Sequence, residues 1–101
     1  MKRIVSSIAL ASLALTINAQ SWPTVTPEAK PGTRWWWLGS AVDQENLKWN
    51  LSEYGKHGIG AIEITPLYGV QGNQQNNIPY LSDKWMSMLR YTMTQAERNG
   101  I

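Results

Sequence analysis

Glu63 is the residue of this 101-residue chain that says most about chemistry. It lies in an apolar, β-branched stretch, residues 59–65 (IGAIEIT), where strand alternation places Ile62 and Ile64 on one face and Glu63 on the other. If the isoleucines pack against helices, Glu63 points away from them. A carboxylate inside a fold is costly unless it is paired, hydrogen-bonded, or bound to a cation or a ligand hydroxyl. Two hypotheses stay open: an ion pair with an Arg or Lys of another strand, and contact with a ligand or metal.

Aromatic side chains form the second group of candidates. Residues 34–38 (RWWWL) predict a short strand covered on both faces, in which Trp36 points opposite to Trp35 and Trp37. A tryptophan at the carboxyl end of a strand can stack on the apolar face of a sugar, so Trp36 and Trp37 are candidate substrate-binding residues. The alternative is that they fill the core beneath helices.

Tyr68 is the fourth candidate, because it lies in the loop directly after Pro66 and its phenol can hydrogen-bond a ligand. The alternative is a rim residue that packs its own loop. The sequence lacks the motifs of several other kinds of functional site. It contains no cysteine and a single histidine, His57, so a Cys- or His-based zinc cluster is excluded, and it has no glycine-rich phosphate motif and no GxSxG motif.

The elements that would position these residues alternate between strand and helix. Asp43 is placed to cap a helix over residues 43–57, with Leu47, Leu51 and Tyr54 along its buried face. A second strand at 59–65 ends before Pro66, and the Gly-, Asn- and Gln-rich residues 67–81 form a candidate functional loop. Ser82 and Asp83 begin a second helix that ends at Gly100. Its expected stripe is Trp85 or Met86, Leu89, Met93 and Ala96.

The first 33 residues are expected to lie outside this fold. Lys2 and Arg3, the apolar run 4–17 and Ala19 make residues 1–19 a predicted signal peptide, and 14 apolar residues are too few to span a bilayer. Residues 20–33 read as a Pro-rich linker. Without residues 1–19 the chain has equal numbers of acidic and basic residues, which removes the basic-patch argument for nucleic acid. We expect an exported protein, periplasmic or extracellular, with no stable membrane anchor.

The order strand–helix–strand–helix predicts an α/β fold with parallel strands, and two such units are too few to close or cover a sheet. We therefore expect residues 34–101 to be the first two units of a (β/α)₈ barrel of roughly 250 residues, in a chain that is an N-terminal fragment. In such a barrel Glu63 points into the interior.

The stretch RWWWLGSAVDQENLKWNLSEYGKHGIGAIEITPLYGVQG, followed by LSDKWMSML, resembles the start of the catalytic domain of glycoside hydrolase family 106, the α-L-rhamnosidases of polysaccharide-degrading bacteria. The resemblance covers residues 34–101, and its most specific parts are the tryptophan triplet, the Gly-Ile-Gly turn at 58–60 and EITPLYG at 63–69. It implies a (β/α)₈ barrel that cleaves α-linked rhamnose with inversion, a rhamnose-containing glycan as substrate, and a calcium ion near it in the full-length enzyme.

Inverting hydrolysis needs a general acid and a general base, and Glu63 is the one plausible inward carboxylate. The resemblance therefore implies that the catalytic pair lies downstream of Ile101 and that the fragment alone is inactive. Two other hypotheses remain: a small secreted carbohydrate-binding module that uses its tryptophans, and a periplasmic interaction protein whose strands pair with a partner by edge addition.

Overall fold

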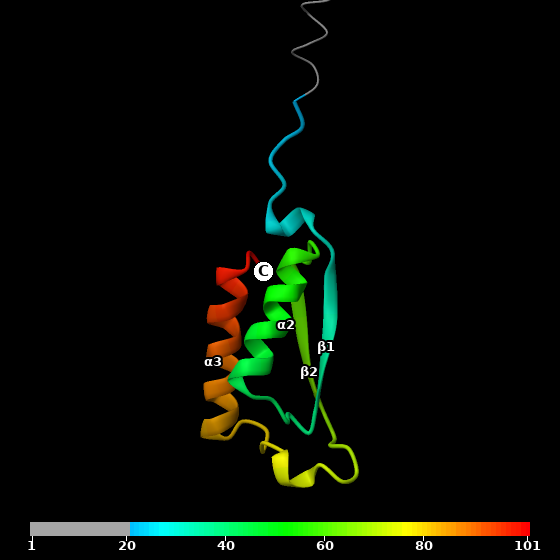
Figure 1. Ribbon diagram of the computed structural model, residues 1–101, viewed down its shortest axis with the longest axis vertical. Helices are drawn as coiled ribbons and strands as arrows, with labels where there is room; N and C mark the ends of the chain where they lie inside the picture. The colour runs from blue at the N-terminus through cyan, green and yellow to red at the C-terminus, as the bar shows by residue number, and fades with distance from the viewer. Residues whose placement is uncertain (1–20) are drawn as a thin grey trace, which may run out of the picture.

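The computed structural model describes residues 21–101, so the predicted signal peptide lies outside the described residues. Two strands and two helices alternate along the chain (Figure 1). Their bounds are β1 Gly32–Leu38, α2 Gln44–Lys56, β2 Ala61–Leu67 and α3 Asp83–Arg98, with short 3₁₀ turns η1 Pro27–Ala29 and η2 Gln74–Asn76. The predicted α/β class is confirmed at this level. Over residues 21–101, neither helix combines the length and the apolar character that crossing a membrane would require.

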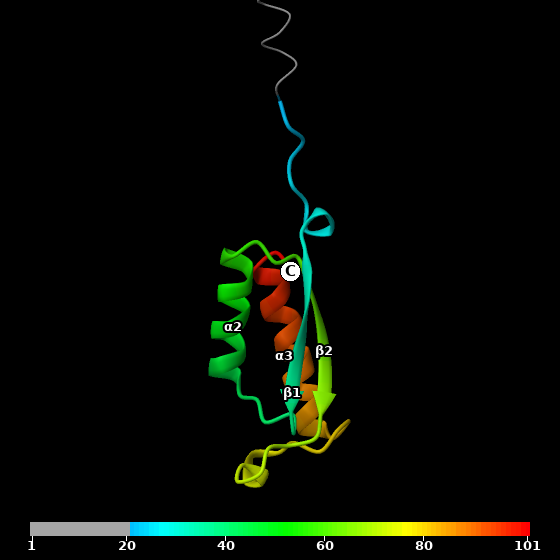
Figure 2. The same ribbon diagram turned by 90° about the vertical axis from the view of Figure 1, so that its right-hand side faces the viewer.

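The strands run parallel and pair in register from Gly32 opposite Ala61 to Leu38 opposite Leu67. Both helices lie against the same face of this two-stranded sheet (Figure 2). Within residues 21–101 the hydrophobic core contains five buried side chains: Trp37, Leu47, Leu51, Ile78 and Trp85. The opposite face of the sheet carries no helix of the described chain. Arg34, Trp36, Leu38 and Glu63 are exposed on it, whereas Thr65 and Leu67 are half-buried.

Both strands begin or end at different residues from those expected. β1 starts at Gly32, inside the predicted linker, because Gly32 and Thr33 pair with β2. β2 is displaced by two residues and includes Pro66, which was expected to end it. A proline cannot donate to a ladder and is confined to sheet edges. Pro66 is the last residue but one of β2, so the missing N–H lies at the carboxyl end of the strand rather than in its middle.

Five aromatic rings form a continuous row through the core, called here the aromatic row. Its members in order are Tyr54, Trp35, Trp37, Trp85 and Tyr80. Neighbouring ring centroids lie 5.5, 5.9, 6.1 and 4.9 Å apart in that order, and each pair meets edge to face. This geometry suits the ring quadrupoles. The row connects α2, β1, α3 and the loop before α3, so it ties all layers of the unit together.

The buried face of α3 matches the expected stripe at Trp85, with Met86 and Leu89 packed against the core, but not at Met93. Met93 is 62% exposed, while the polar side chains of Thr92 and Gln95 are buried. The hydroxyl of Thr92 donates to the carbonyl of Met88 at 2.8 Å, so its burial does not leave that hydroxyl unpaired. Met93 lies instead beside the free edge of β2, in a groove also lined by Ile62 and other apolar side chains. We call this the edge groove.

Asp43 caps α2 as predicted, and this cap makes stability depend on pH. Hydrogen bonds from the backbone N–H of Asn46 at 2.9 Å, and then from its side chain, hold the pKa of Asp43 below its ordinary value. A lowered folded-state pKa means that the stabilisation is present above the unfolded pKa, about 4, and is lost as pH falls through the folded pKa. We expect the melting temperature of Asp43→Asn to fall less than that of wild type between pH 5 and pH 3. Parallel acid slopes for the two proteins, measured by circular dichroism, would contradict this.

Candidate functional site

α/β folds place their binding and catalytic sites at the carboxyl ends of parallel strands. The face of the sheet that carries no helix extends to this end. We define the open face by the side chains that alternate away from the helices. They are Arg34, Trp36 and Leu38 of β1, and Glu63, Thr65 and Leu67 of β2. The loop between β2 and α3 lies across the same end of the sheet (Figure 1). The open face and this loop together form the candidate site.

Glu63 points away from the helices, as predicted, and meets Arg34 across the strand pair. The Nε atom of Arg34 lies 3.3 Å from the Oε2 atom of Glu63, and their side chains are 72% and 64% exposed. The structure therefore contains the ion pair that the first hypothesis predicted. An ion pair this exposed contributes about 0–1 kcal/mol to stability. Both charged groups remain accessible from the open side, so the pair leaves contact with a ligand available.

Trp36 and Trp37, both predicted to bind substrate, lie on opposite faces. Trp36 is 63% exposed and projects from the open face opposite Thr65. Trp37 is 1% exposed and packs in the core with Leu47. The buried side chain of Trp37 therefore cannot contact a sugar in this structure. The prediction that it binds substrate is corrected: Trp37 is a core residue. The cause is strand alternation, which gives Trp35 and Trp37 the same face as the helices.

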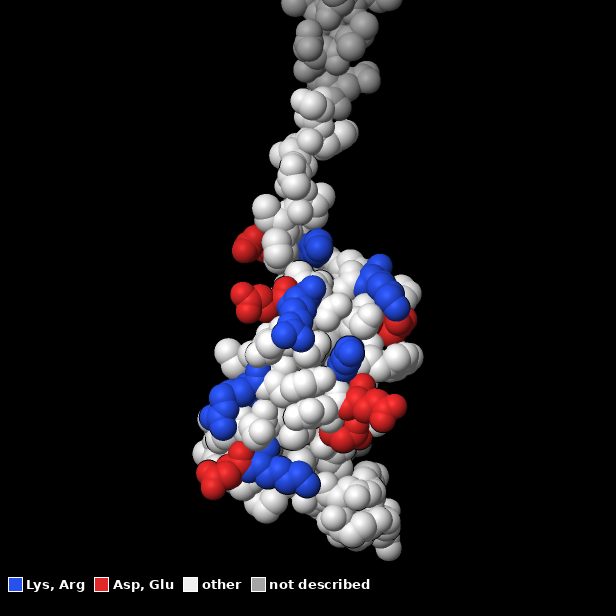
Figure 3. Space-filling model, turned by 60° about the vertical axis from the view of Figure 1, so that its left-hand side comes forward, with Lys and Arg blue, Asp and Glu red and all other residues white. Residues whose placement is uncertain are grey.

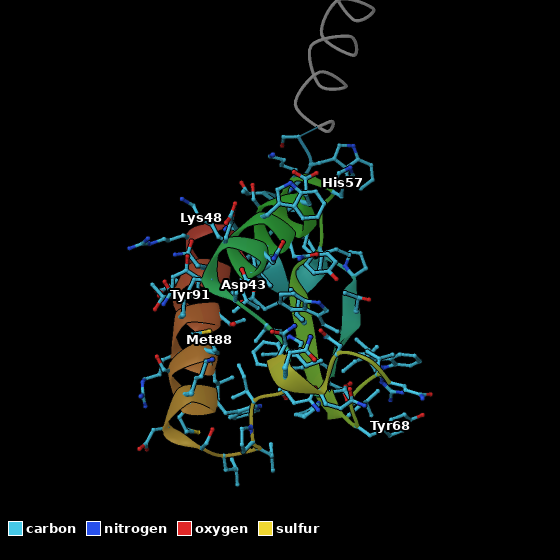
Figure 4. The ribbon with its side chains drawn as sticks, turned by 60° about the horizontal axis from the view of Figure 1, so that its bottom comes forward. Asp43, Lys48, His57, Tyr68, Met88 and Tyr91 are labelled. Atoms are coloured by element: carbon cyan, nitrogen blue, oxygen red, sulfur yellow. The ribbon has the colours of Figure 1, made fainter. Side chains whose placement is uncertain are left out.

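Tyr68 follows β2 and projects outward, with 86% of its surface exposed (Figure 4). It lines a cavity of about 410 Å³ at the carboxyl ends of both strands, which we call the end pocket. The other lining residues are Gly39, Ser40, Pro66, Leu67, Gly69, Asn77, Ile78 and Tyr80. Its volume falls in the range of small-molecule sites, roughly 300–1,000 Å³. Tyr68 is thus an exposed residue at the rim of the pocket.

Gly39 holds the pocket walls together. Its N–H donates to the carbonyls of Leu67 at 2.9 Å and Tyr68 at 3.1 Å, and its own carbonyl accepts from the N–H of Ile78 at 3.0 Å. Its φ of +61° lies in the left-handed region, where a side chain is strained. Glycine at this position therefore joins the end of β1 to the end of β2 and to the loop.

Over residues 21–101, His, Asp and Glu side chains do not gather in any group of three. The carboxylate of Glu63 is engaged by Arg34, and that of Asp43 caps α2. No step proposed below runs through a metal.

Three residues of the candidate site were not singled out from the sequence: Arg34, Asn77 and Tyr80. Arg34 could have been found from strand parity, since it has the same parity as Trp36 and faces Glu63 once the strands pair in register. Asn77 and Tyr80 belong to the stretch 67–81 that was predicted to be a functional loop. No local signal distinguishes them from the other polar residues of that loop.

Comparison of the chain with protein-family models, with curated proteins and with solved structures finds no match in any of the three. The assignment of function therefore depends on the geometry above and on the resemblance of the motifs.

Proposed function

We propose that this chain is the amino-terminal part of an exported glycoside hydrolase similar to the inverting α-L-rhamnosidases, and that its open face contributes to binding a rhamnose-containing glycan. The parallel β1–α2–β2–α3 order, with both helices on one face, supports the first two units of a (β/α)₈ barrel. In that arrangement the open face lines the barrel interior. The predicted signal peptide supports export to the periplasm or the medium.

The observation that carries the proposal is the row Arg34, Glu63 and Trp36 on the open face, in which the ion pair lies in the amino-terminal half of the strands and Trp36 lies nearer the carboxyl end of β1. The indole of Trp36 offers an apolar surface for a sugar ring. The ion pair offers charged donors and acceptors for sugar hydroxyls, which form stronger hydrogen bonds than neutral groups do. In this proposal, these residues bind and orient the sugar, but they do not supply both the general acid and the general base.

Inverting hydrolysis needs two carboxyl groups roughly 6.5–9.5 Å apart. Within residues 21–101 the open face holds one, that of Glu63. The proposal therefore assigns the general acid and general base to residues outside this chain, and the chain by itself is proposed to be inactive. A calcium ion near the substrate of the full enzyme is proposed from the resemblance alone.

The substitution Glu63→Gln tests the role of the open face. In the complete translation product we expect it to lower kcat/KM for an aryl α-L-rhamnoside about tenfold to a hundredfold, because it removes a charged hydrogen-bonding partner. The melting temperature is expected to stay almost unchanged, since the ion pair with Arg34 is exposed. Kinetics and thermal melting of the same preparations measure both effects.

The matched control is Glu53→Gln, which removes the carboxylate that pairs with Lys56 at 2.8 Å on the outside of α2. It should change neither activity nor melting. Unchanged activity of Glu63→Gln with a clear loss of stability would show that Glu63 serves the fold alone.

A second candidate, a small secreted binding or interaction protein, is favoured by one observation. Within the described chain each strand of the sheet has an unpaired edge, and such an edge can accept a partner strand. Sequencing the gene beyond codon 101 separates the two candidates. An open frame of several hundred further codons supports the hydrolase, whereas a stop codon supports the binding or interaction protein.

A further inference from the structure

Every aromatic side chain of this chain can give up an electron. The sequence contains six tryptophans and four tyrosines but no phenylalanine. Phenylalanine is the aromatic residue that packs without bringing a polar group into a core and that mild one-electron oxidants leave intact. Five of the oxidisable rings make up the aromatic row, so no member of the row is inert to such oxidants.

The indole of Trp37, in the middle of the row, is buried with its polar atom unpaired. Trp37 is 1% exposed, and its Nε1 atom has no hydrogen-bond partner within residues 21–101. Buried polar groups are almost always paired, because an unpaired one costs free energy. This cost points to a use of the Trp37 indole other than hydrogen bonding.

The missing acceptor also controls the proton that oxidation makes acidic. An indole that loses an electron becomes a radical cation, and it stays one if no base takes its N–H proton. Within the described chain Trp37 has no acceptor, and the N–H of Trp85 faces the hydroxyl of Ser40 at 2.9 Å, which is a weak base. Both indoles are therefore expected to keep the proton, to remain strong oxidants, and to take an electron from a neighbouring ring.

Tyr80 ends the row in a different environment. Its ring centroid lies 4.9 Å from that of Trp85, and Tyr80 is 65% exposed. A phenol that loses an electron gives its proton to water and becomes a neutral phenoxyl radical, which oxidises indole poorly. At the other end of the row Tyr54 is half-buried, so its phenol has less access to water. An electron vacancy in the row is therefore expected to come to rest at Tyr80.

We propose that the aromatic row carries electron vacancies from the core to Tyr80 at the surface. An external one-electron oxidant removes an electron from Trp35, which is half-buried. One electron then moves from Trp37 to Trp35 and one from Trp85 to Trp37, over centroid separations of 5.9 and 6.1 Å. The last electron comes from Tyr80, and its phenolic proton goes to water.

The relay keeps the products of oxidation out of the core. A soluble thiol restores the phenol of Tyr80 by donating a hydrogen atom, and the thiol becomes a thiyl radical. Each electron transfer leaves the ring that gained the electron unchanged, so the tryptophans are not consumed. This role does not depend on the proposed function.

Tyr68 provides a reference inside the same molecule. It lies in the same loop as Tyr80 and is more exposed, at 86%, but none of the aromatic pairs of residues 21–101 includes it. Residues 66–82 contain no Asp, Glu, Lys, Arg or His, and this loop is the uncoloured lobe at the lower end of Figure 3. Asp83 and Lys84, which follow it, carry opposite charges. Exposure alone thus favours oxidation of Tyr68, whereas the relay favours Tyr80.

Radical labelling of the complete translation product tests the relay. Azidyl radicals, which are uncharged and oxidise indole faster than phenol at neutral pH, are generated by radiolysis of an azide solution. A nitroso spin trap adds covalently to tyrosyl radicals, and peptide mapping by mass spectrometry gives the labelled fraction of each tyrosine. We expect more label on Tyr80 than on Tyr68, against the order of their exposure.

The variant Trp37→Phe keeps an aromatic ring in the core but interrupts the row. It should reverse the order, so that Tyr68 carries more label than Tyr80, while Tyr54 at the other end of the row keeps its label. Trp49→Phe removes an exposed tryptophan of α2 that lies outside the row, and it should leave the wild-type order unchanged. Circular dichroism before irradiation shows whether each variant is folded.

A second pair of variants leaves the core intact. Tyr80→Phe removes the trap at the surface, so oxidation products of the Trp85 indole should increase, whereas Tyr68→Phe should leave them unchanged. Preferential labelling of Tyr68 in the wild-type protein, the wild-type order in folded Trp37→Phe, or unchanged oxidation of Trp85 in Tyr80→Phe would each overturn the relay.

Discussion

Substitution of Trp37 by alanine is expected to lower the free energy of unfolding by about 3–5 kcal/mol, the usual cost of removing a large buried aromatic ring. Trp37 is 1% exposed and belongs to the core with Leu47 and Trp85. It also stands in the middle of the aromatic row, so its loss separates Trp35 from Trp85. Since domains are stable by only about 5–15 kcal/mol, most of the stability disappears. Denaturant unfolding of the complete translation product measures the change.

Trp36→Ala is the matched control for this prediction. Trp36 is the next residue in the same strand but is 63% exposed on the open face. Its removal is expected to change stability by no more than about 0.5 kcal/mol, as for other exposed positions. Under the proposed function it should instead weaken glycan binding. Equal destabilisation by both substitutions would show that the two faces of β1 have been assigned wrongly.

Residues 20–101 expressed alone are expected to associate rather than to melt as a cooperative monomer. Within the described residues the sheet has two strands, and each has an outer edge without a partner. The edge groove beside β2, about 310 Å³ in volume, is lined mainly by apolar side chains such as Ile62, Ile64 and Met93. Unpaired edges and apolar grooves favour association, and the chain has no cysteine with which to form a disulfide.

Light scattering coupled to size exclusion, together with thermal melting, measures this outcome. A variant that places charge in the edge groove, Ile62→Lys, should increase the monomer fraction if that groove mediates association. The same lysine at Gln75, far from the groove, serves as its control. A monomeric segment that melts cooperatively and hydrolyses a rhamnoside would contradict the expectation, and with it the assignment of the acid and base to residues outside this chain.

Elements whose local sequence decides their structure could be predicted. Asp43 begins α2 because a carboxylate at that position satisfies the free N–H of Asn46. The opposite orientations of Trp36 and Trp37 follow from the strand period alone. Which of the two lies inside could not be read from the sequence, because both are tryptophan and the choice depends on where the helices pack.

The site was less predictable, because its parts come from separate segments. Glu63 was singled out, but its partner Arg34 is 29 residues away and meets it only through the register of the strands. The space that the Asn77 side chain occupies depends on Gly39 and Gly69, which follow two different strands. The sequence alone does not indicate that these glycines lie close together. The burial of Thr92 in place of Met93 likewise depends on how α3 is rotated against its neighbours.

The aromatic row also gives the protein an optical property. Rings whose centroids lie 4.9–6.1 Å apart exchange excitation energy, so the tryptophans of the row absorb and emit as a coupled group. Tyr80 ends the row at the wall of the end pocket, and Trp85 is its contact inside. A molecule that settles against Tyr80 shifts this coupling at its outer end. We therefore expect the near-ultraviolet circular dichroism of the unlabelled protein to change when a ligand occupies the pocket.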